Sequence, residues 1–269
     1  MAKKEERYHI RALDRAISVL SILSDGTPRT MVELAEACNL SVSTMFRILA
    51  TLADHHYVER DDVTGKYALG FACLELARSY QMHNHIRRVA LPELEKLRDE
   101  TKETIHLAIL DNMEVAYLEK LHGLHAIGLM SSQVGGRALA YCTGLGKALL
   151  AHEDPDRVRA HFSQHGLKVF TDTTIRTVDE LMAHLARIRE QGYATDYGEH
   201  EPEVFCIAAP IFDAGNHAVA AISISGPSNR MMPLESGHNL TRILEAARNI
   251  SRQLGYATQP EESTANTKE

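Results

Sequence analysis

The run Gly144-Leu145-Gly146-Lys147 is one of the few stretches of this 269-residue chain whose residue types suit the binding of a charged ligand. It is not a phosphate-binding P-loop, which needs a glycine where Tyr141 stands and a serine or threonine where Ala148 stands. Two glycines ahead of a helical stretch still let a ligand approach the backbone, and a helix N-terminus can hold an anion such as a carboxylate. A plain strand-to-helix turn accounts for the same residues equally well.

A second candidate is the segment Ile222-Ser223-Ile224-Ser225-Gly226, in which polar and apolar residues alternate as they do in a strand. The segment lacks the first glycine of the GxSxG motif, so it does not form the nucleophile elbow of a hydrolase. If the isoleucines face a core, the two serine hydroxyls line a surface or a pocket together, although a solvent-exposed polar face is the commoner outcome. Cys206, within the apolar run VFCIAAPI, most often has the role of a small buried residue.

Metal sites and catalytic sites are not indicated by the sequence. Fifteen histidines are many, and His122 and His125 lie near each other, but no HExxH or other metal-binding spacing occurs. The four cysteines are far apart and form no CxxC pair, which argues against a zinc site and a disulfide framework. The chain offers no activated nucleophile, no paired general acid and base, and no metal-ligand set. We therefore expect that the protein is not an enzyme and needs no cofactor.

The stretch from residue 30 to residue 70 has the pattern of a winged helix. Thr30 and Glu33 form a capping box in front of a short helix, and Ser41 is a good N-cap for a second helix. Only Asn39 and Leu40 separate the helices, so they must cross at a steep angle, which is the helix-turn-helix geometry. The residues after the second helix alternate and turn at 62–65, as a small hairpin does. The second helix also has an apolar stripe that we expect to face the core: Val42, Met45, Leu49 and Leu52.

In a helix-turn-helix, the N-terminal part of the second helix enters the major groove of DNA. Helical spacing directs Ser43, Thr44 and Arg47 outward, where hydroxyls can contact phosphate or base edges and arginine can bind guanine with two hydrogen bonds. Ordinary solvated helix residues have the same spacing, so the pattern alone leaves both readings open. With the cap and the wing lysine added, the expected DNA-binding set is Ser41, Val42, Ser43, Thr44, Arg47 and Lys66.

The charge balance limits the kinds of partner. The chain has 29 lysines and arginines against 36 aspartates and glutamates, a formal net charge of −7, which argues against a protein that coats nucleic acid. Residues 1–83 hold 10 basic and 11 acidic side chains, so this part is near neutral and the rest is acidic. No apolar run approaches the length of a membrane span, and residues 1–15 lack the apolar region of a signal peptide. We therefore expect a cytoplasmic protein.

Helical and strand patterns divide the chain into four parts: a winged-helix DNA-binding domain at 9–70, a linker helix at 71–84, a second domain at 85–256 and a disordered tail at 257–269. The second domain begins with a helix to about residue 102. Its further helices are expected at 148–151, opened by the run 143–147, and at 154–166, 178–191 and 235–254. Its strands are expected at 104–110, 115–121, 127–131, 193–196, 204–212 and 218–225. This order predicts an α+β domain with an antiparallel sheet.

Several of these motifs, in this order, resemble the IclR-type transcriptional regulators over nearly the whole chain, from Arg11 to Tyr256. The similar segments are ELAEACNLSVSTMFRILATL with its wing, TGLGKALLA, IREQGYATDYGEHEPEVFCIAAPIFD and AAISISGPSNR. The resemblance implies an N-terminal winged helix and a C-terminal effector-binding domain of GAF-like α/β form. We accordingly expect a repressor that binds double-stranded operator DNA and governs a catabolic operon. Dimerisation through the N-terminal domain and the linker helix is also implied, often with assembly into a tetramer.

The resemblance further implies a small organic acid as effector: a keto acid, a sugar-acid derivative or an aromatic acid. The positions that match the family pocket are Met130, Gly144, Leu145, Asp196, Val204, Cys206, Ser223 and Ser225. Backbone N–H groups of Gly144 and Leu145 would take the carboxylate together with the two serines, and Asp196 would take a hydroxyl or fix its strand. Two departures concern the shape of the pocket. Leu139 stands where many relatives have proline, and Val204 is smaller than the leucine common in some relatives.

Two other kinds of function stay open on the sequence alone. One is an enzyme that turns over a small acid in the same pocket and uses its helix-turn-helix only as a structural or dimerising appendage. The absence of an activated nucleophile or an acid–base pair argues against it. The other is a constitutive architectural DNA-binding protein, against which the acidic, polar-lined second domain argues.

Overall fold

The computed structural model describes residues 10–124, 130–232 and 237–257. Internal contacts divide the chain after His83 into an N-terminal unit and a C-terminal unit. The third strand expected at 127–131 falls largely outside the described residues, and so does nearly all of the disordered tail expected at 257–269.

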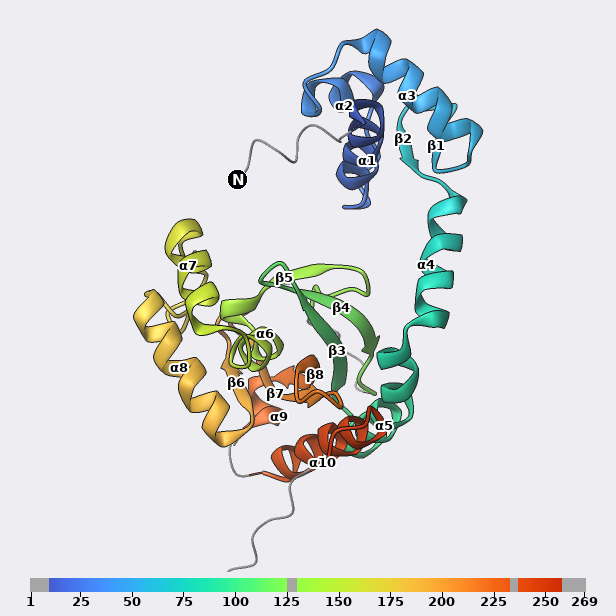
Figure 1. Ribbon diagram of the computed structural model, residues 1–269. Coiled ribbons are helices and arrows are strands. Elements are labelled where there is room, and N and C mark those ends of the chain that lie inside the picture. The colour runs from blue at the N-terminus through green and yellow to red at the C-terminus, as the bar shows by residue number, and fades with distance from the viewer. Residues whose placement is uncertain (1–9, 125–129, 233–236, 258–269) are drawn as a thin grey trace, which may run out of the picture. The chain divides into compact units, whose positions relative to one another are not determined.

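Helices and a short hairpin form the N-terminal unit (Figure 1): α1 (Arg11–Leu23), α2 (Met31–Ala37), α3 (Val42–Asp54), β1 (Val58–Arg60), β2 (Tyr67–Leu69) and α4 (Phe71–His83). Local signals explain where α2 and α3 begin. Thr30 and Glu33 form the capping box of α2, and the Ser41 hydroxyl accepts the Thr44 N–H at 3.3 Å in front of α3. The predicted winged helix-turn-helix is confirmed.

The core of this unit is formed by apolar side chains of α1, α2, α3 and β1: Val19, Leu23, Leu34, Ala35, Met45, Leu49, Leu52 and Val58. The stripe expected along α3 is confirmed at Met45, Leu49 and Leu52, which are buried. It is wrong for Val42, whose side chain is 46% exposed. Val42 is the first residue of α3, and side chains of a helix lean toward its N-terminus, so this side chain extends past the end of the core.

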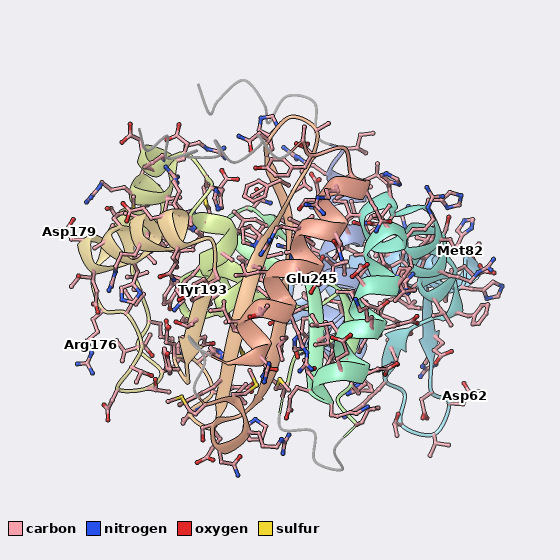
Figure 2. The ribbon with its side chains drawn as sticks, turned by 90° about the horizontal axis from the view of Figure 1, so that it is seen from below. Asp62, Met82, Arg176, Asp179, Tyr193 and Glu245 are labelled. Carbon is pink, nitrogen blue, oxygen red and sulfur yellow. The ribbon has the colours of Figure 1, made fainter. Side chains whose placement is uncertain are left out.

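The hairpin between β1 and β2 turns where the sequence predicts. The two strands pair antiparallel, and the Asp61 carboxylate accepts the N–H groups of Val63 and Thr64, each at 2.8 Å. Gly65 has a φ of +69°, which glycine adopts without steric strain. Figure 2 shows Asp62 pointing outward from this turn. The wing is therefore a short, locally fixed loop whose tip is open to solvent.

The C-terminal unit is built on an antiparallel sheet with the strand order β5-β4-β3-β8-β7-β6. Its strands are β3 (Thr104–Asp111), β4 (Glu114–Leu121), β5 (Arg137–Leu139), β6 (Ala194–Tyr197), β7 (Val204–Phe212) and β8 (Ala218–Pro227). Its helices are α5 (His85–Thr101), α6 (Gly144–Leu150), α7 (Pro155–His165), α8 (Val178–Gln191), α9 (Ser228–Met231) and α10 (His238–Gln253). The predicted α+β class is confirmed. No sequence pattern predicts β5, α9 or the 3-10 turn at Ala140–Cys142, because such short elements show no periodicity.

The two faces of this sheet carry different side chains. Helices α5 and α10 lie against one face of the sheet (Figure 1). The large aliphatic residues of the strands pack on that side: Ile105, Leu107, Ile207, Ile211, Ile222 and Ile224. Alanines face α6 on the other side: Ala108, Ala194, Ala208 and Ala221. Helices α7 and α8 lie beyond α6 and complete that layer (Figure 1). Because alanine has a small side chain, α6 can lie close to the strands.

Helix α6 also lies close to the 3-10 turn that precedes it. A Cβ atom at Gly146 would be 2.3 Å from both the Cα atom and the carbonyl oxygen of Ala140, far inside van der Waals contact. Glycine is therefore required at this position by packing alone. The contact fixes the place where α6 begins.

We predict that Gly146→Ala lowers the free energy of unfolding by about 1–3 kcal/mol, because the added methyl group overlaps the Ala140 backbone. Urea unfolding followed by circular dichroism measures the change. Gly144→Ala is the matched control, since its methyl group would meet neighbouring side chains at 3.4–3.8 Å, which is ordinary contact. Equal destabilisation of the two variants would contradict the prediction.

Candidate functional site

Polar side chains form a row across four strands on the α6 side of the sheet. Asp196 of β6 lies directly opposite Cys206 of β7, which lies opposite Ser225 of β8 and, one strand further, Thr104 of β3. Directly paired residues of antiparallel strands point to the same face, so these side chains share one surface. Ser225 is 2% exposed and Asp196 is 5% exposed. The serine hydroxyls thus line a buried site, and the solvent-facing alternative for this strand is wrong.

The start of α6 lies against this row. A Cβ atom at Gly144 would be 3.5 Å from the Cβ of Cys206 and 3.8 Å from the Cβ of Asp196. Thr143 caps the helix by accepting the Gly146 N–H at 3.2 Å. Among the described residues, the N–H groups of Gly144 and Leu145 have no hydrogen-bond partner. Two backbone donors are therefore available beside the polar row.

The structure thus brings six of the eight expected pocket positions together: Gly144, Leu145, Asp196, Cys206, Ser223 and Ser225. Val204 is buried two residues before Cys206 on β7, opposite Pro227, at the end of the same face. Met130 is half-buried, and its carbonyl oxygen accepts a hydrogen bond from the Lys120 ammonium group at 3.1 Å. That bond ties the Met130 segment to β4.

His106 is a site residue that sequence reasoning missed. It pairs with Ser223 across β3 and β8, and its Nδ1 atom lies 3.3 Å from the Ser223 hydroxyl and 3.4 Å from the Ser225 hydroxyl. Its Nε2 atom lies 2.9 Å from the Ser132 hydroxyl. Burial, with the nearby charge of Lys120, lowers the pKa of His106 from 6.5 to about 3. The imidazole is therefore neutral and serves both as a hydrogen-bond donor and as an acceptor.

Other groups around the row are also held neutral by burial. The Tyr117 ring centroid lies 5.5 Å from that of His106, and burial raises the pKa of the Tyr117 phenol above its usual value. Burial likewise raises the pKa of the Cys142 thiol to about 12 and that of Cys206 above its usual range. Such thiols are poor nucleophiles, because the thiolate is the reactive form. The residues offer hydrogen bonds to a ligand but no covalent chemistry.

Charged groups gather at the β6 end of the row. The Lys147 ammonium of α6 forms a buried ion pair with Glu199, and the Glu199 N–H donates to the Asp196 carboxylate at 2.8 Å. Burial raises the pKa of both carboxyl groups, although Lys147 acts in the opposite direction. Lys147 therefore pairs directly with Glu199 and acts on Asp196 through its charge alone. Within the described part of the chain, the Oε2 atom of Glu199 has no hydrogen-bond partner.

A short segment that follows the undescribed residues 125–129 is tied to three parts of the unit. Ser131 donates from its hydroxyl to the Glu201 carboxylate at 2.5 Å, and the Lys120 ammonium donates to the Ser132 carbonyl at 2.5 Å. The Ser132 hydroxyl meets His106, as described above. Residues 130–132 are therefore held beside His106, at the β3 end of the polar row.

The expected DNA-binding residues lie on and around α3. Ser41, Ser43 and Arg47 are exposed, and Thr44 is half-buried. The Ser41 hydroxyl also lies 2.9 Å from the Thr44 hydroxyl, so both take part in the helix cap. Lys66 is exposed on the wing. In the described ranges, neither basic side chain is in an ion pair, which leaves both charges available to phosphate or bases.

A winged helix-turn-helix with exposed basic residues at Arg47 and Lys66, in a chain whose second unit buries a row of polar side chains, is the architecture of a transcriptional regulator. Among the described residues, no group of three or more metal-ligating side chains occurs. Sequence models of two families match the chain. The IclR helix-turn-helix domain matches residues 12–62, and the C-terminal domain of bacterial IclR regulators matches residues 78–252. The chain belongs to the IclR family of transcriptional regulators.

Individual relatives agree with this assignment. The regulator BhcR of Paracoccus denitrificans is 34% identical over 247 residues, which cover 92% of this chain and 88% of that protein. The repressor AllR of Escherichia coli K12 is 31% identical over 251 residues, which cover 93% and 92%. The structure of an IclR homologue from Microbacterium hydrocarbonoxydans in complex with 4-hydroxybenzoate is 29% identical, with a TM-score of 0.78, and the match covers 90% of this chain and 98% of that one.

A search for membrane spans gives a negative result for residues 10–124, 130–232 and 237–257. No helix in these ranges is both long enough and apolar enough to cross a bilayer.

We predict that His106 makes stability depend on pH. Its pKa is lowered to about 3 in the folded state, so below about pH 6.5 the unfolded chain binds a proton here that the folded chain does not. Stability is therefore lost as the pH falls toward 3. Between about pH 5.5 and pH 4, the free energy of unfolding should fall by about 1.4 kcal/mol per pH unit more in the wild type than in His106→Asn. Urea unfolding at these pH values measures both slopes, and equal slopes would contradict the prediction.

Proposed function

We propose that this protein is a repressor of a catabolic operon, and that a small organic acid bound in its C-terminal unit controls its binding to operator DNA. The observation that carries the proposal is the buried polar row beside the open N–H groups of α6, in a chain that also holds a winged helix-turn-helix. The repressor part of the proposal draws on the relative AllR, which is named a repressor. Because its partner is chromosomal DNA, we propose that the protein acts in the cytoplasm.

The chemistry of the pocket favours an acid. The N–H groups of Gly144 and Leu145 and the hydroxyls of Ser223 and Ser225 offer several donors in one place, which suits a carboxylate. Asp196, at the other end of the row, is an acceptor that suits a hydroxyl group. A keto acid, a sugar-acid derivative or an aromatic acid fits this arrangement, and we propose Met130, Val204 and Cys206 as further lining residues. The relative in complex with 4-hydroxybenzoate, an aromatic acid, supports the class.

We further propose that the working form is a homodimer or a homotetramer. Helix α4 buries none of its residues within the described structure, yet it is rich in apolar side chains. Five of them are more than half exposed: Phe71, Leu74, Leu76, Tyr80 and Met82. Exposed apolar surface of this extent is typical of an interaction site. A second copy of the linker at 71–84, between the domains proposed at 9–70 and 85–256, would cover it and would place two winged helices on one operator.

We predict that an organic acid that raises the melting temperature of the wild type does so much less for Ser223→Ala. Loss of a hydrogen bond to a charged group weakens binding by about 1.5–3 kcal/mol, or roughly 10- to 150-fold. Gly144→Ala should also lose the shift, because its methyl group would project toward Cys206 and Asp196. A thermal-shift screen with pyruvate, gluconate and 4-hydroxybenzoate measures this. Ser163→Ala, at an exposed serine of α7, is the control, and equal shifts in all variants would contradict the pocket.

We predict that Arg47→Ala weakens binding to an operator duplex, selected from random DNA with the wild-type protein, by about 1–3 kcal/mol. The reason is the loss of a guanidinium group that binds a base with two hydrogen bonds. Fluorescence anisotropy with a labelled duplex at fixed salt measures the affinity. Arg176→Ala, in the loop before α8 (Figure 2), removes an exposed arginine of the other unit and should leave the affinity unchanged. An unchanged affinity of Arg47→Ala would remove this residue from the contact set.

A further inference from the structure

Helix α3 exposes two large apolar side chains that the core does not use. Val42 is 46% exposed and Phe46 is 58% exposed, whereas Met45 and Leu49 on the same helix are fully buried. Val42 and Phe46 are four residues apart, so they lie on the same side of the helix, one above the other. Together they form an apolar strip on a helix that otherwise follows the usual division into a buried and a polar face.

The strip lies next to the polar face expected to contact DNA. Each residue of a helix is rotated by about 100° from the one before. The row formed by Val42 and Phe46 therefore lies next to the row formed by Ser43 and Arg47. All four belong to the N-terminal half of α3, which is the part of a recognition helix that reaches base edges. No acidic residue occurs on α3 before Asp54, and Arg47 supplies a positive charge. The surface around the strip is therefore compatible with the negative charge of DNA.

We infer that Phe46 and Val42 determine operator specificity by contact with thymine methyl groups in the major groove. This inference rests on the proposed function. The thymine methyl is the apolar group that base pairs present in that groove, while the other positions present hydrogen-bond donors and acceptors. Phenylalanine and valine side chains cannot satisfy such donors and acceptors, so a guanine–cytosine pair under the strip would lose hydrogen bonds to water without replacement. A half-site then combines a guanine for Arg47 with one or two adjacent thymines.

Methyl-group recognition is tested by removing single methyl groups from the DNA. Duplexes are first selected from a random pool with the full-length protein, and each thymine of the recovered half-site is then replaced by deoxyuridine, which lacks only the methyl group. At one or two positions the wild type should bind the uracil duplex about three- to fivefold more weakly, as expected for one buried methyl group. Phe46→Ala should bind the thymine duplex more weakly and show no difference between thymine and uracil.

Two variants sharpen the test. Arg47→Ala should lose overall affinity but keep the wild-type ratio between thymine and uracil duplexes. Val42→Ala should reduce the ratio at the second position if two thymines are read. Because Phe46 is largely exposed, Phe46→Ala should keep the wild-type melting temperature, and that measurement excludes unfolding as a cause.

Each contrary result has a distinct meaning. Failure to recover any duplex would overturn the proposed function, and this inference with it. Recovery of an operator at which uracil and thymine bind the wild type equally, or at which Phe46→Ala keeps the uracil effect, would overturn this inference alone. A change in subunit number by light scattering for Phe46→Ala, with its uracil effect intact, would instead assign the strip to a contact between copies of the chain.

Discussion

The close approach of α6 to the sheet is the constraint on which the C-terminal unit depends. Gly146 lies against the backbone of Ala140, Gly144 lies against Ala208, and the sheet presents further alanines beneath the helix. The same sheet face changes from alanine to polar residues where α6 begins, since Ala208 and Cys206 are successive residues on that face of β7. The free N–H groups of the helix therefore lie beside the polar row as a consequence of packing. Larger residues at the glycines would separate the donors from the row.

Burial then sets the chemical character of that row. It keeps His106 as neutral imidazole and Tyr117, Cys142 and Cys206 as protonated groups, so they can bind a ligand but cannot act as activated nucleophiles or as acid–base pairs tuned near neutral pH. A buried ion pair lies at the β6 end, where Lys147 is paired with Glu199. A ligand bound here, as we propose, would meet donors at one end and carboxyl groups at the other. This polarity fits recognition without reaction.

Local signals in the sequence predicted the elements well, and contacts between distant segments were not predictable. Caps at Thr30 and Ser41 and the stripe through Met45 and Leu49 located the helix-turn-helix, because these signals act within one or two turns. Lys147 was read only as part of a glycine run, yet it is buried against a glutamate 52 residues further along the chain. His106 carried no sequence signal either, since its meaning comes from strand pairing with Ser223.

Because the first 83 residues are near neutral, sequence-specific binding would depend largely on the apolar and polar contacts proposed for α3. An N-terminal unit with 10 basic and 11 acidic side chains gains little affinity from phosphate contacts when it binds DNA alone. In the proposed dimer, two N-terminal units on one operator would add their contacts, and the exposed apolar side chains of α4 would supply the surface that joins them. If each N-terminal unit binds DNA weakly by itself, operator affinity would depend strongly on how the two units of the dimer are arranged. A ligand that binds the two arrangements of such a dimer with different affinity would then control DNA binding without touching α3.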